Sequence, residues 1–155
     1  MSLSQAKEYL KQFNRDKDII EFDVSSATVE LAAQALNCLP ERIAKTLSFK
    51  IDDRAIIIVT AGDMKIDNHK YKETFKTKAK MLSREEVLPK IGHEVGGVCP
   101  FGIKSNVDIY LDVSLKRFET VFPACGSANS AIELTIDDLK DYINASWIDV
   151  CKTVW

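Results

Sequence analysis

The sequence predicts a mixed α/β fold, in which peripheral helices surround a partly closed, β-barrel-like sheet. Along the 155 residues, apolar positions recur at helical spacing in some segments and alternate at strand spacing in others. The two kinds of segment follow one another irregularly, and several predicted strands are joined by short or loop connections. A doubly wound parallel sheet needs regular strand–helix–strand units, so this order favours a mixed sheet.

Length and composition indicate a single domain over residues 1–155. A chain of this size buries roughly two-thirds of the surface of its unfolded state without disulfides or metals. Its 46% hydrophobic and 28% charged residues are ordinary for a globular protein. The net charge of −2 does not mark the whole molecule as a nucleic-acid binder, so such a partner requires a local basic patch.

The cysteine spacing and the N-terminal pattern favour a cytoplasmic location. The four cysteines form no CxxC pair and lie at no metal-ligand spacing from either histidine. The first 13 residues have the pattern of an amphipathic helix, not of a signal peptide, and no apolar run is long enough to cross a membrane. We therefore expect a cytoplasmic protein with free thiols, no metal and no organic cofactor.

Serine and threonine mark the starts of most predicted helices, because their side chains cap the first free backbone N–H groups. Thr28, Ser83 and Thr135 each precede acidic residues, which favour a helix N-terminus. The predicted helices are 2–13, 28–36, a short one from 40, 83–90 and one from 135.

Two predicted strands are especially informative. Residues 55–61 are an almost unbroken apolar run, typical of a central buried strand. In residues 43–51, alternation places Lys45 on the same apolar face as Ile43 and Leu47. An unpaired ammonium there is costly, so Lys45 is either functional or lies at a frayed strand start with its head in water. The other predicted strands are 19–24, 107–111, 119–122, 131–134 and 147–148.

A glycine-rich loop is the strongest candidate for a site. Four of the six glycines lie within the eleven residues from Gly92 to Gly102. Glycine allows positive φ angles, and successive main-chain N–H groups can form a nest for a carbonyl oxygen or an anion. Val95, Val98 and Phe101 stand between the glycines as apolar anchors, which a freely solvated loop does not need. We interpret the loop as the floor of an active site; a mobile surface loop is the alternative.

A basic segment runs from Lys65 to Lys80, with six lysines against two acidic residues and a local net charge of +4. Tyr71 and Phe75 lie among the lysines, so the segment can lie beside a phosphate backbone. A solvated surface is the alternative for such a charge run.

Four short motifs occur in order along nearly the whole chain. They are Lys45-Thr46-Leu47, Gly62-Asp63, Val95-Gly96-Gly97-Val98-Cys99-Pro100-Phe101-Gly102 and Ala131-Ile132-Glu133-Leu134-Thr135. Together they resemble the YbaK/EbsC family, which is related to the editing insertion domain of bacterial prolyl-tRNA synthetase. The resemblance implies a barrel-like α/β fold and a trans-editing deacylase, which hydrolyses the ester joining a wrong amino acid to tRNA. Typical substrates are cysteine or alanine on proline tRNA.

The resemblance also implies partners and site residues. The partner is mischarged tRNA, and prolyl-tRNA synthetase is a second candidate. Lys45 resembles the essential lysine of the family, and Gly96 and Gly97 resemble the glycines whose backbone meets the aminoacyl carbonyl. The further substrate-binding candidates are Phe22, Val98, Cys99, Pro100, Gly126, Ser127 and Asn129. With tRNA as partner, the candidate contacts in the basic segment are Lys70, Lys72, Lys76 and Lys78.

Three positions depart from the cysteine-specific members of that family. Ala124 and Ala131 stand where those relatives tend to carry a serine and an acidic residue around the second loop. Phe22 stands where some of them have an aromatic hydroxyl. The pocket can therefore prefer another small side chain, and the amino acid it selects stays open.

An aminoacyl ester is already activated, so the enzyme must position it and stabilise the developing oxyanion. We expect the Gly96–Val98 N–H groups to bind the carbonyl oxygen. Lys45 would hold the ribose or phosphate of the terminal adenosine, or stabilise charge near the ester. Water would be the acceptor, helped by the ribose 2′-hydroxyl or by a cysteinyl thiol.

Two other functions stay open. A thiol hydrolase would use Cys99 as nucleophile and His93 as base, although no helix N-terminus lowers the pKa of this thiol. A non-catalytic module would bind an aminoacyl-tRNA end or a synthetase, since the proposed site contains no obligatory general base.

Overall fold

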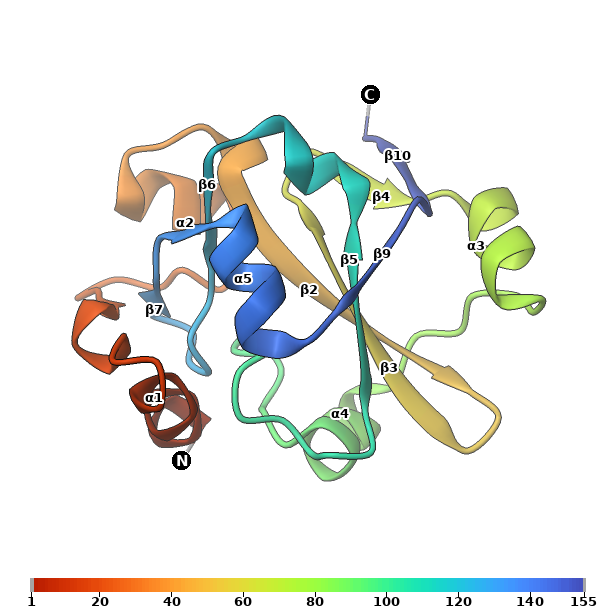
Figure 1. Ribbon diagram of the computed structural model, residues 1–155, viewed down its shortest axis with the longest axis horizontal. Helices are drawn as coiled ribbons and strands as arrows, with labels where there is room; N and C mark the ends of the chain where they lie inside the picture. Colours follow the sequence, from red (N-terminus) through yellow and green to blue (C-terminus); the bar gives the residue numbers. More distant parts are fainter. Residues whose placement is uncertain (1, 155) are drawn as a thin grey trace.

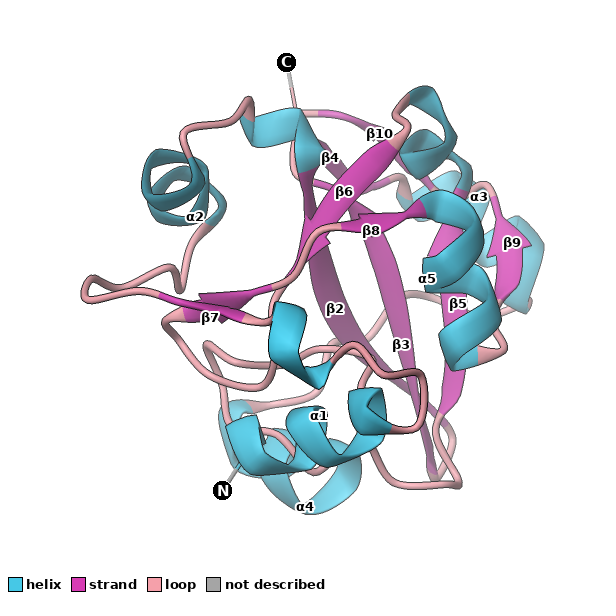
Figure 2. Cartoon of the chain, turned by 60° about the vertical axis from the view of Figure 1, so that its left-hand side comes forward, coloured by secondary structure: helices cyan, strands magenta, loops and turns pink. Residues whose placement is uncertain are grey.

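The structure is a computed structural model that describes residues 2–154. Its centre is a six-stranded sheet, which curls rather than lying flat (Figures 1 and 2). In their order across the sheet, the strands are β8 (Leu134–Thr135), β6 (Thr120–Pro123), β2 (Ile43–Ile51), β3 (Arg54–Ala61), β5 (Asp108–Asp112) and β9 (Ser146–Ile148).

β2 and β3 form a long antiparallel hairpin in the middle of this sheet (Figure 1). Each residue from Ala44 to Ile51 has a partner in β3, so the register is fixed over the whole length of the hairpin. Asp52 adopts a left-handed φ of 54° at the turn. After Arg54, all residues of β3 are buried, which confirms the predicted central strand.

Parallel and antiparallel pairs occur together in the sheet. β6 pairs in parallel with the start of β2, β5 with β3, and β9 with β5, whereas β8 is antiparallel to β6. The predicted mixed sheet with peripheral helices is therefore confirmed. Two small antiparallel sheets flank it: β1 (Ile20–Glu21) with β7 (Ser130–Ala131), and β4 (Met64–Ile66) with β10 (Cys151–Thr153).

The helices lie around the sheet, with α5 in front of it in the view of Figure 1. The α-helices are α1 (Ser2–Lys11), α2 (Val29–Leu36), α3 (Asn68–Phe75), α4 (Arg84–Ile91) and α5 (Ile136–Ile143). Short 3₁₀ helices are η1 (Asp16–Asp18), η2 (Pro40–Arg42) and η3 (Val113–Arg117). The predicted caps are confirmed: Thr28 accepts from Leu31 N–H, Thr135 accepts from Asp138 N–H, and Ser83 forms a capping box with Glu86.

The strand parity of β3 separates two parts of the core. Val59 and Ala61 pack into a cluster that includes Leu10 of α1 and Leu139 of α5. Ile56 and Ile58 instead pack with Phe49 of β2 and Tyr71 of α3. Both faces of the sheet are thus covered by helices. Among the described residues, no helix combines the length and apolarity needed to cross a bilayer.

Some strand predictions need correction. The predicted strand 131–134 is two short strands, because the chain passes from β7, paired with β1, to β8, paired with β6. The predicted strand 19–24 forms β-pairs over only two residues. β4 and β10 were not predicted, since three-residue strands are too short to show an alternating pattern.

Candidate functional site

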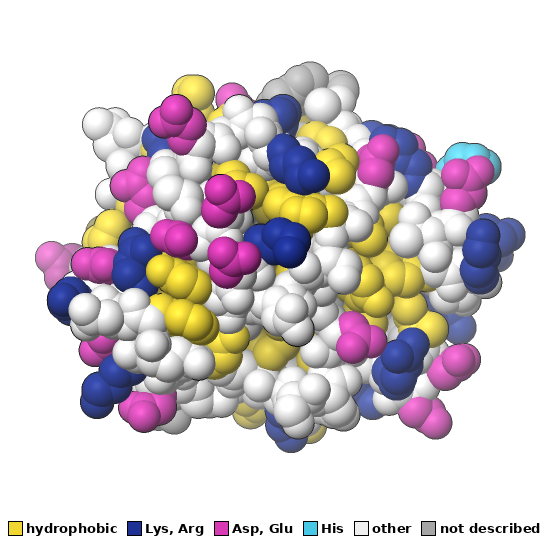
Figure 3. Space-filling view, viewed as in Figure 1, with side chains coloured by type: hydrophobic (Ala, Val, Ile, Leu, Met, Phe, Trp, Pro, Cys, Tyr) yellow, Lys and Arg dark blue, Asp and Glu magenta, His cyan; other side chains and the backbone are white. Residues whose placement is uncertain are grey.

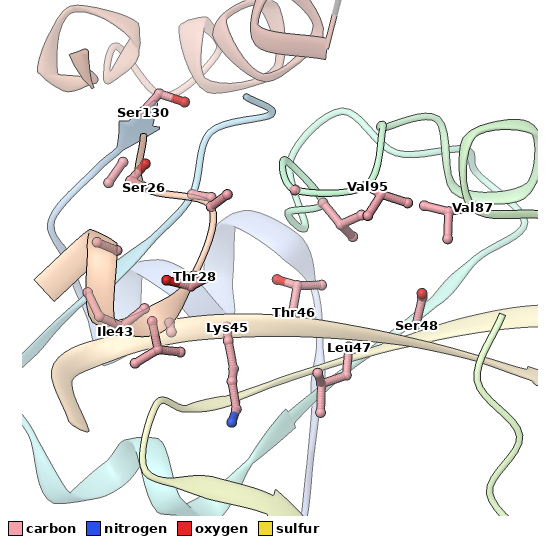
Figure 4. Close-up of a pocket in the computed structure, with 18 of the residues that line it drawn as sticks. Ser26, Thr28, Ile43, Lys45, Thr46, Leu47, Ser48, Val87, Val95 and Ser130 are labelled. Atoms are coloured by element: carbon pink, nitrogen blue, oxygen red, sulfur yellow. The ribbon is translucent and has the colours of Figure 1, made fainter. Parts of the chain in front are cut away.

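A cavity of about 420 Å³ opens beside β2. One wall is the segment before and at the start of α2, a second is the glycine-rich loop together with α4, and the floor is β2 itself (Figure 4). Its lining includes Ser26, Ala27, Thr28, Thr46, Ser48, Met81, Arg84, Val95, Gly96, Val98, Ala124, Ser130 and Ala131. A volume of this size fits a small amino acid and part of a nucleoside, within the usual range for ligand sites.

The parity of β2 decides which side chains face the cavity. Thr46 and Ser48 point toward the side where Val87 and Val95 lie, whereas Lys45 and Leu47 point to the other side of the strand (Figure 4). Alternation of successive side chains in a strand requires this division. Lys45 therefore lies on the same face of β2 as Leu47, as the alternation predicts.

The ammonium group of Lys45 does not point toward the glycine-rich loop. Its Nζ donates to the carbonyl oxygen of Gly62 at 3.4 Å. Burial lowers the pKa of Lys45, while nearby groups including Asp63 act in the opposite direction. The sequence predicts that the Lys45 amine and the Gly96 and Gly97 backbone face the same cavity, and the structure does not show this. Lys45 contributes to the cavity floor, but its ammonium group lies on the opposite side of β2 from Thr46 (Figure 4).

Gly96 and Gly97 are glycines for different reasons. Gly96 has a φ of 95°, and a Cβ added there would make ordinary van der Waals contacts, with Ala27 and Ala128 no closer than 3.9 Å. At Gly97, a Cβ would lie 2.8 Å from the backbone of Gly126 and Ser127, so the two loops touch through bare peptide units. Gly96 therefore allows a left-handed backbone conformation at the cavity wall, and Gly97 allows the two loops to come into contact.

The amide groups of this loop are not equally available. The N–H of Gly97 donates to the carbonyl of Glu94 at 3.0 Å and closes a turn. Within residues 2–154, the N–H groups of Gly96 and Val98 have no such acceptor. Both residues line the cavity, so they are the amides that can meet a carbonyl oxygen there.

Three predicted site residues, Gly126, Ser127 and Asn129, support the neighbouring loops rather than lining the cavity. Gly126 is buried against Gly97, and Ser127 Oγ lies 2.6 Å from Ser130 Oγ. Asn129 donates through Nδ2 to the carbonyl of Phe22 and accepts from Phe22 N–H through its own carbonyl. Ser130, which follows them in the chain, is a cavity residue.

Cys99 and Pro100 are buried in the core, outside the cavity lining. Cys99 Sγ lies 3.5 Å from His93 Nε2, and that nitrogen lies 2.6 Å from the carbonyl oxygen of Phe101. The short contact places the imidazole proton on Nε2, so this nitrogen cannot act as a base toward the thiol. Burial raises the pKa of Cys99 to about 12 and lowers that of His93. The pair therefore has neither access nor a thiolate, and it does not support thiol catalysis.

Two hydroxyl groups of cavity residues lack partners. Ser26 Oγ and Thr46 Oγ1 are buried and make no hydrogen bond in the described part of the chain. A buried hydroxyl without a partner is costly, so such groups often bind a ligand. No acidic side chain lines the cavity in residues 2–154, and Arg84 brings a cationic side chain to its rim.

A partly buried ion pair lies near Lys45. Asp63, in the turn after β3, accepts two hydrogen bonds from Arg117 at 2.6 and 3.0 Å. The Asp63 side chain is 4% exposed, and these bonds lower its pKa. The pair fixes the turn whose preceding residue, Gly62, accepts from Lys45.

The four candidate tRNA-contact lysines differ in whether they form an ion pair within the protein. Lys70 is bound to Asp149 and to the carbonyl of Cys151, both at 3.1 Å. Lys72, Lys76 and Lys78 are exposed and have no ion pair within residues 2–154. The first lysine is therefore occupied, and the other three have free charge.

Sequence reasoning missed several residues of the cavity. Thr46 could have been found, because strand parity places it opposite Lys45. Ser26, Thr28 and Arg84 come from segments that touch β2 only in the folded chain, so no local pattern marks them as cavity residues. Ala124 and Ala131 were singled out only by the resemblance, and both lie in the wall.

Comparison with known proteins gives consistent matches. Residues 24–142 match the family model described as "Aminoacyl-tRNA editing domain". The chain is 56% identical over 154 residues to "Uncharacterized protein YwhH" of Bacillus subtilis (strain 168), covering 98% of each. It is 36% identical over 122 residues to a proline–tRNA ligase of Bacillus pumilus (strain SAFR-032), covering 74% of this chain but 22% of the ligase.

A solved structure has the same fold. It is described as a proposed trans-editing enzyme for prolyl tRNA synthetase, and it aligns with a TM-score of 0.88 over 97% of both chains. The sequence identity is 24%, so this likeness concerns the fold.

Proposed function

The chain belongs to the aminoacyl-tRNA editing domain family, and on this basis we propose that it hydrolyses the ester of mischarged aminoacyl-tRNA in trans. One observation carries the proposal. The family match over residues 24–142 contains every residue that lines the 420 Å³ cavity, from Ser26 to Ala131. The part of the chain that resembles editing domains is thus the part that builds the cavity.

The proposed chemistry needs little more than positioning. An aminoacyl ester is activated, so the main task is to hold its carbonyl and to stabilise the oxyanion that water attack creates. We assign this role to the N–H groups of Gly96 and Val98, which line the cavity and lack acceptors within residues 2–154. Loss of one such donor typically raises the barrier by about 2.7–4 kcal/mol.

The walls favour a small amino acid. Ala27, Ala124 and Ala131 contribute only methyl groups, and no acidic side chain of the described residues lines the cavity. Alanine and cysteine fit such a wall, and proline tRNA is the proposed carrier because relatives include proline–tRNA ligases. Excluding one methylene is worth only ~1–3 kcal/mol, so we expect leaky discrimination among small amino acids.

The prediction that Lys45 is essential is kept as a proposal with a changed role. Since its Nζ donates to Gly62 behind β2, Lys45 would position the strand that presents Thr46 to the cavity. A positioning role predicts that Lys45→Met lowers kcat with little effect on KM and that Lys45→Arg restores part of the loss. Equal deacylation by Lys45→Met and the unsubstituted protein would refute an essential lysine.

A deacylation panel tests the function. Cysteinyl-, alanyl-, seryl- and threonyl-esters on proline tRNA are incubated with the protein, and the rate of ester loss is compared with the uncatalysed rate. We expect the fastest hydrolysis with alanyl or cysteinyl esters and the slowest with the threonyl ester. Rates equal to the uncatalysed reaction for all four substrates would contradict the proposal. Binding without turnover would instead support the non-catalytic module.

Cys99→Ser separates editing from thiol hydrolysis. The editing proposal predicts retained kcat/KM, because the thiol is fully buried and its pKa is raised to about 12. A thiol mechanism predicts complete loss of turnover in a variant that unfolds at the same denaturant concentration as the unsubstituted protein.

A further inference from the structure

A run of exposed basic side chains lies beside the cavity. We define the basic track as Lys76, Lys78, Lys80 and Arg84. Its four side chains are exposed, and none has an ion pair with any residue in the range 2–154. Two neighbouring lysines differ, since Lys70 is paired with Asp149 and Lys50 with Glu86.

Pairing with β2 fixes the course of this segment. β2 pairs with β6 only at Ile43 and Ala44, so its later edge is open to another chain segment. Lys50 N–H donates to the carbonyl of Lys80 at 2.9 Å, and Leu82 N–H donates to the carbonyl of Ser48 at 3.2 Å. An antiparallel bridge joins Phe49 and Met81 between these two bonds.

Lys78 and Lys80 lie on the outward side of this segment. Both are exposed, whereas Ala79 between them packs into a core cluster, as does Leu82 after the bridge at Met81. In extended backbone, residues two apart lie about 6.6–6.8 Å apart on the same side. This spacing is similar to the separation of consecutive phosphates in an extended nucleic-acid strand.

The track ends at the cavity. Met81 and Arg84 line it, and Lys76 lies at the far end, at the C-terminus of α3. On the face of the molecule that Figure 3 shows, basic and acidic side chains are interspersed and form no continuous path of one sign. Next to the track, Glu86 is paired with Lys50 and accepts from Ser83 N–H, whereas Glu85 is exposed.

We infer that the basic track binds the single-stranded 3′ end of the RNA that carries the aminoacyl ester, through its phosphates. The inference rests on the proposed function, because the ester in the cavity fixes the end of the strand. The nucleotides preceding that end must leave through the mouth of the cavity, and Arg84 and Lys80 offer cations along the exit. Phosphate contacts of this kind add affinity without reading sequence.

The test measures binding to a stable substrate mimic. The probe is an RNA hairpin with a single-stranded 3′ extension, whose terminal ribose carries alanine through an amide that cannot be hydrolysed as an ester. The track variant combines K76Q, K78Q and K80Q. The control variant combines K17Q, K65Q and K152Q, which removes three exposed lysines outside the track and gives the same change in net charge.

The dissociation constant of each protein is measured from 50 to 200 mM salt. With ~0.7 counterions released per phosphate contact on a single strand, the track variant should reduce the slope of log K against log salt by about 2. We expect weaker binding on the order of tenfold at low salt for the track variant, and a near-normal slope for the control. Equal slopes for the two variants would overturn the inference.

A separate measurement distinguishes failure of the inference from failure of the function. The unsubstituted protein is tested for hydrolysis of an alanyl ester of adenosine, which has no preceding phosphate. If the ester is hydrolysed and the salt slope of the track variant is unchanged, the proposed function is supported and RNA binding by the basic track is contradicted. If no aminoacyl ester is hydrolysed but the salt slope changes in the track variant, the proposed function is contradicted and RNA binding by the basic track is supported.

Discussion

Gly96 carries the clearest conformational requirement among the cavity residues, because its φ of 95° lies where other residues are strained. Gly92 offers a matched comparison, since it has a φ of 103° and its added Cβ would come no closer than 3.6 Å to another residue, but it lies outside the cavity lining. The same substitution at the two positions therefore separates backbone strain from a role in the site.

We predict that Gly96→Ala and Gly92→Ala each lower the free energy of unfolding by about 1–2 kcal/mol, the usual cost of a left-handed backbone for a residue with a Cβ. Only Gly96→Ala should also reduce kcat/KM for ester hydrolysis, because it shifts an amide that we propose binds the carbonyl oxygen. Urea unfolding and deacylation rates measure the two effects. A similar loss of activity in both variants would contradict a special role for Gly96.

Thr46 gives a second residue-scale prediction. Its hydroxyl is buried without a partner, so Thr46→Val should leave the free energy of unfolding unchanged or raise it by up to ~1 kcal/mol. If the hydroxyl binds substrate, kcat/KM falls roughly tenfold, the worth of one hydrogen bond.

The control for Thr46→Val is Thr60→Val in the adjacent strand. Thr60 Oγ1 is bound to Ser114 Oγ at 3.1 Å, so this variant should lose about 1–2 kcal/mol of stability and keep its activity. A stability loss in Thr46→Val equal to that in Thr60→Val would indicate that the Thr46 hydroxyl has a partner within the protein.

At the scale of elements, the sequence predicted best where a pattern is long or a cap is explicit. β2 has the predicted bounds because nine alternating residues define a face, and α2 and α5 begin after the predicted threonines. β4 and β10 escaped prediction because each has three residues and owes its conformation to its partner. The direction of Lys45 was predictable from parity, but which face of β2 borders a cavity depends on what covers each face.

The turn between β3 and β4 provides a prediction at this scale. Asp63→Asn removes the charge that pairs with Arg117 and should cost about 2–3 kcal/mol of stability, less than the ~3–5 kcal/mol of a fully buried pair because Arg117 is 42% exposed. Urea unfolding measures the loss. A control is Asp108→Asn, whose partner Arg54 is exposed; that variant should change stability by under about 1 kcal/mol. Equal effects would argue against a structural role of the pair between Asp63 and Arg117.

For the whole molecule, acid stability follows from carboxylates that the fold holds ionised. The bonds from Arg117 lower the pKa of Asp63, and the Ser83 N–H and Lys50 lower that of Glu86 to about 2. Since the folded values lie below the unfolded ones of ~3.9 and ~4.3, this stabilisation is present above pH 4.3 and is lost as the pH falls through the folded values.

We therefore predict a free energy of unfolding that is nearly constant from pH 7 to 5 and declines between about pH 4 and 2. Urea unfolding at each pH gives the curve. Glu86→Gln should flatten part of the decline, because glutamine does not titrate. A variant curve parallel to that of the unsubstituted protein would exclude Glu86 as a contributor.

The fold class was predictable from the irregular order of strands and helices, but the site was predictable only in part. Gly96 and Val98 lie in the cavity as expected, whereas Cys99 and Pro100 are in the core. Sequence spacing shows that a loop is rich in glycine, but it does not show which of its residues turn inward. That depends on the contact between Gly97 and Gly126, which lie far apart in the sequence.

The lack of any carboxylate around the described part of the cavity bears on how an acyl group would enter. The protonated amine of an amino acid would find no counter-charge on the walls and would have to keep its hydration shell. The amine would then face the solvent, and the side chain of the amino acid would enter the cavity first. An ester whose nitrogen carries an acetyl cap would be accepted as readily as the free amino acid, so recognition would depend on bulk at the side chain and not on the ammonium group.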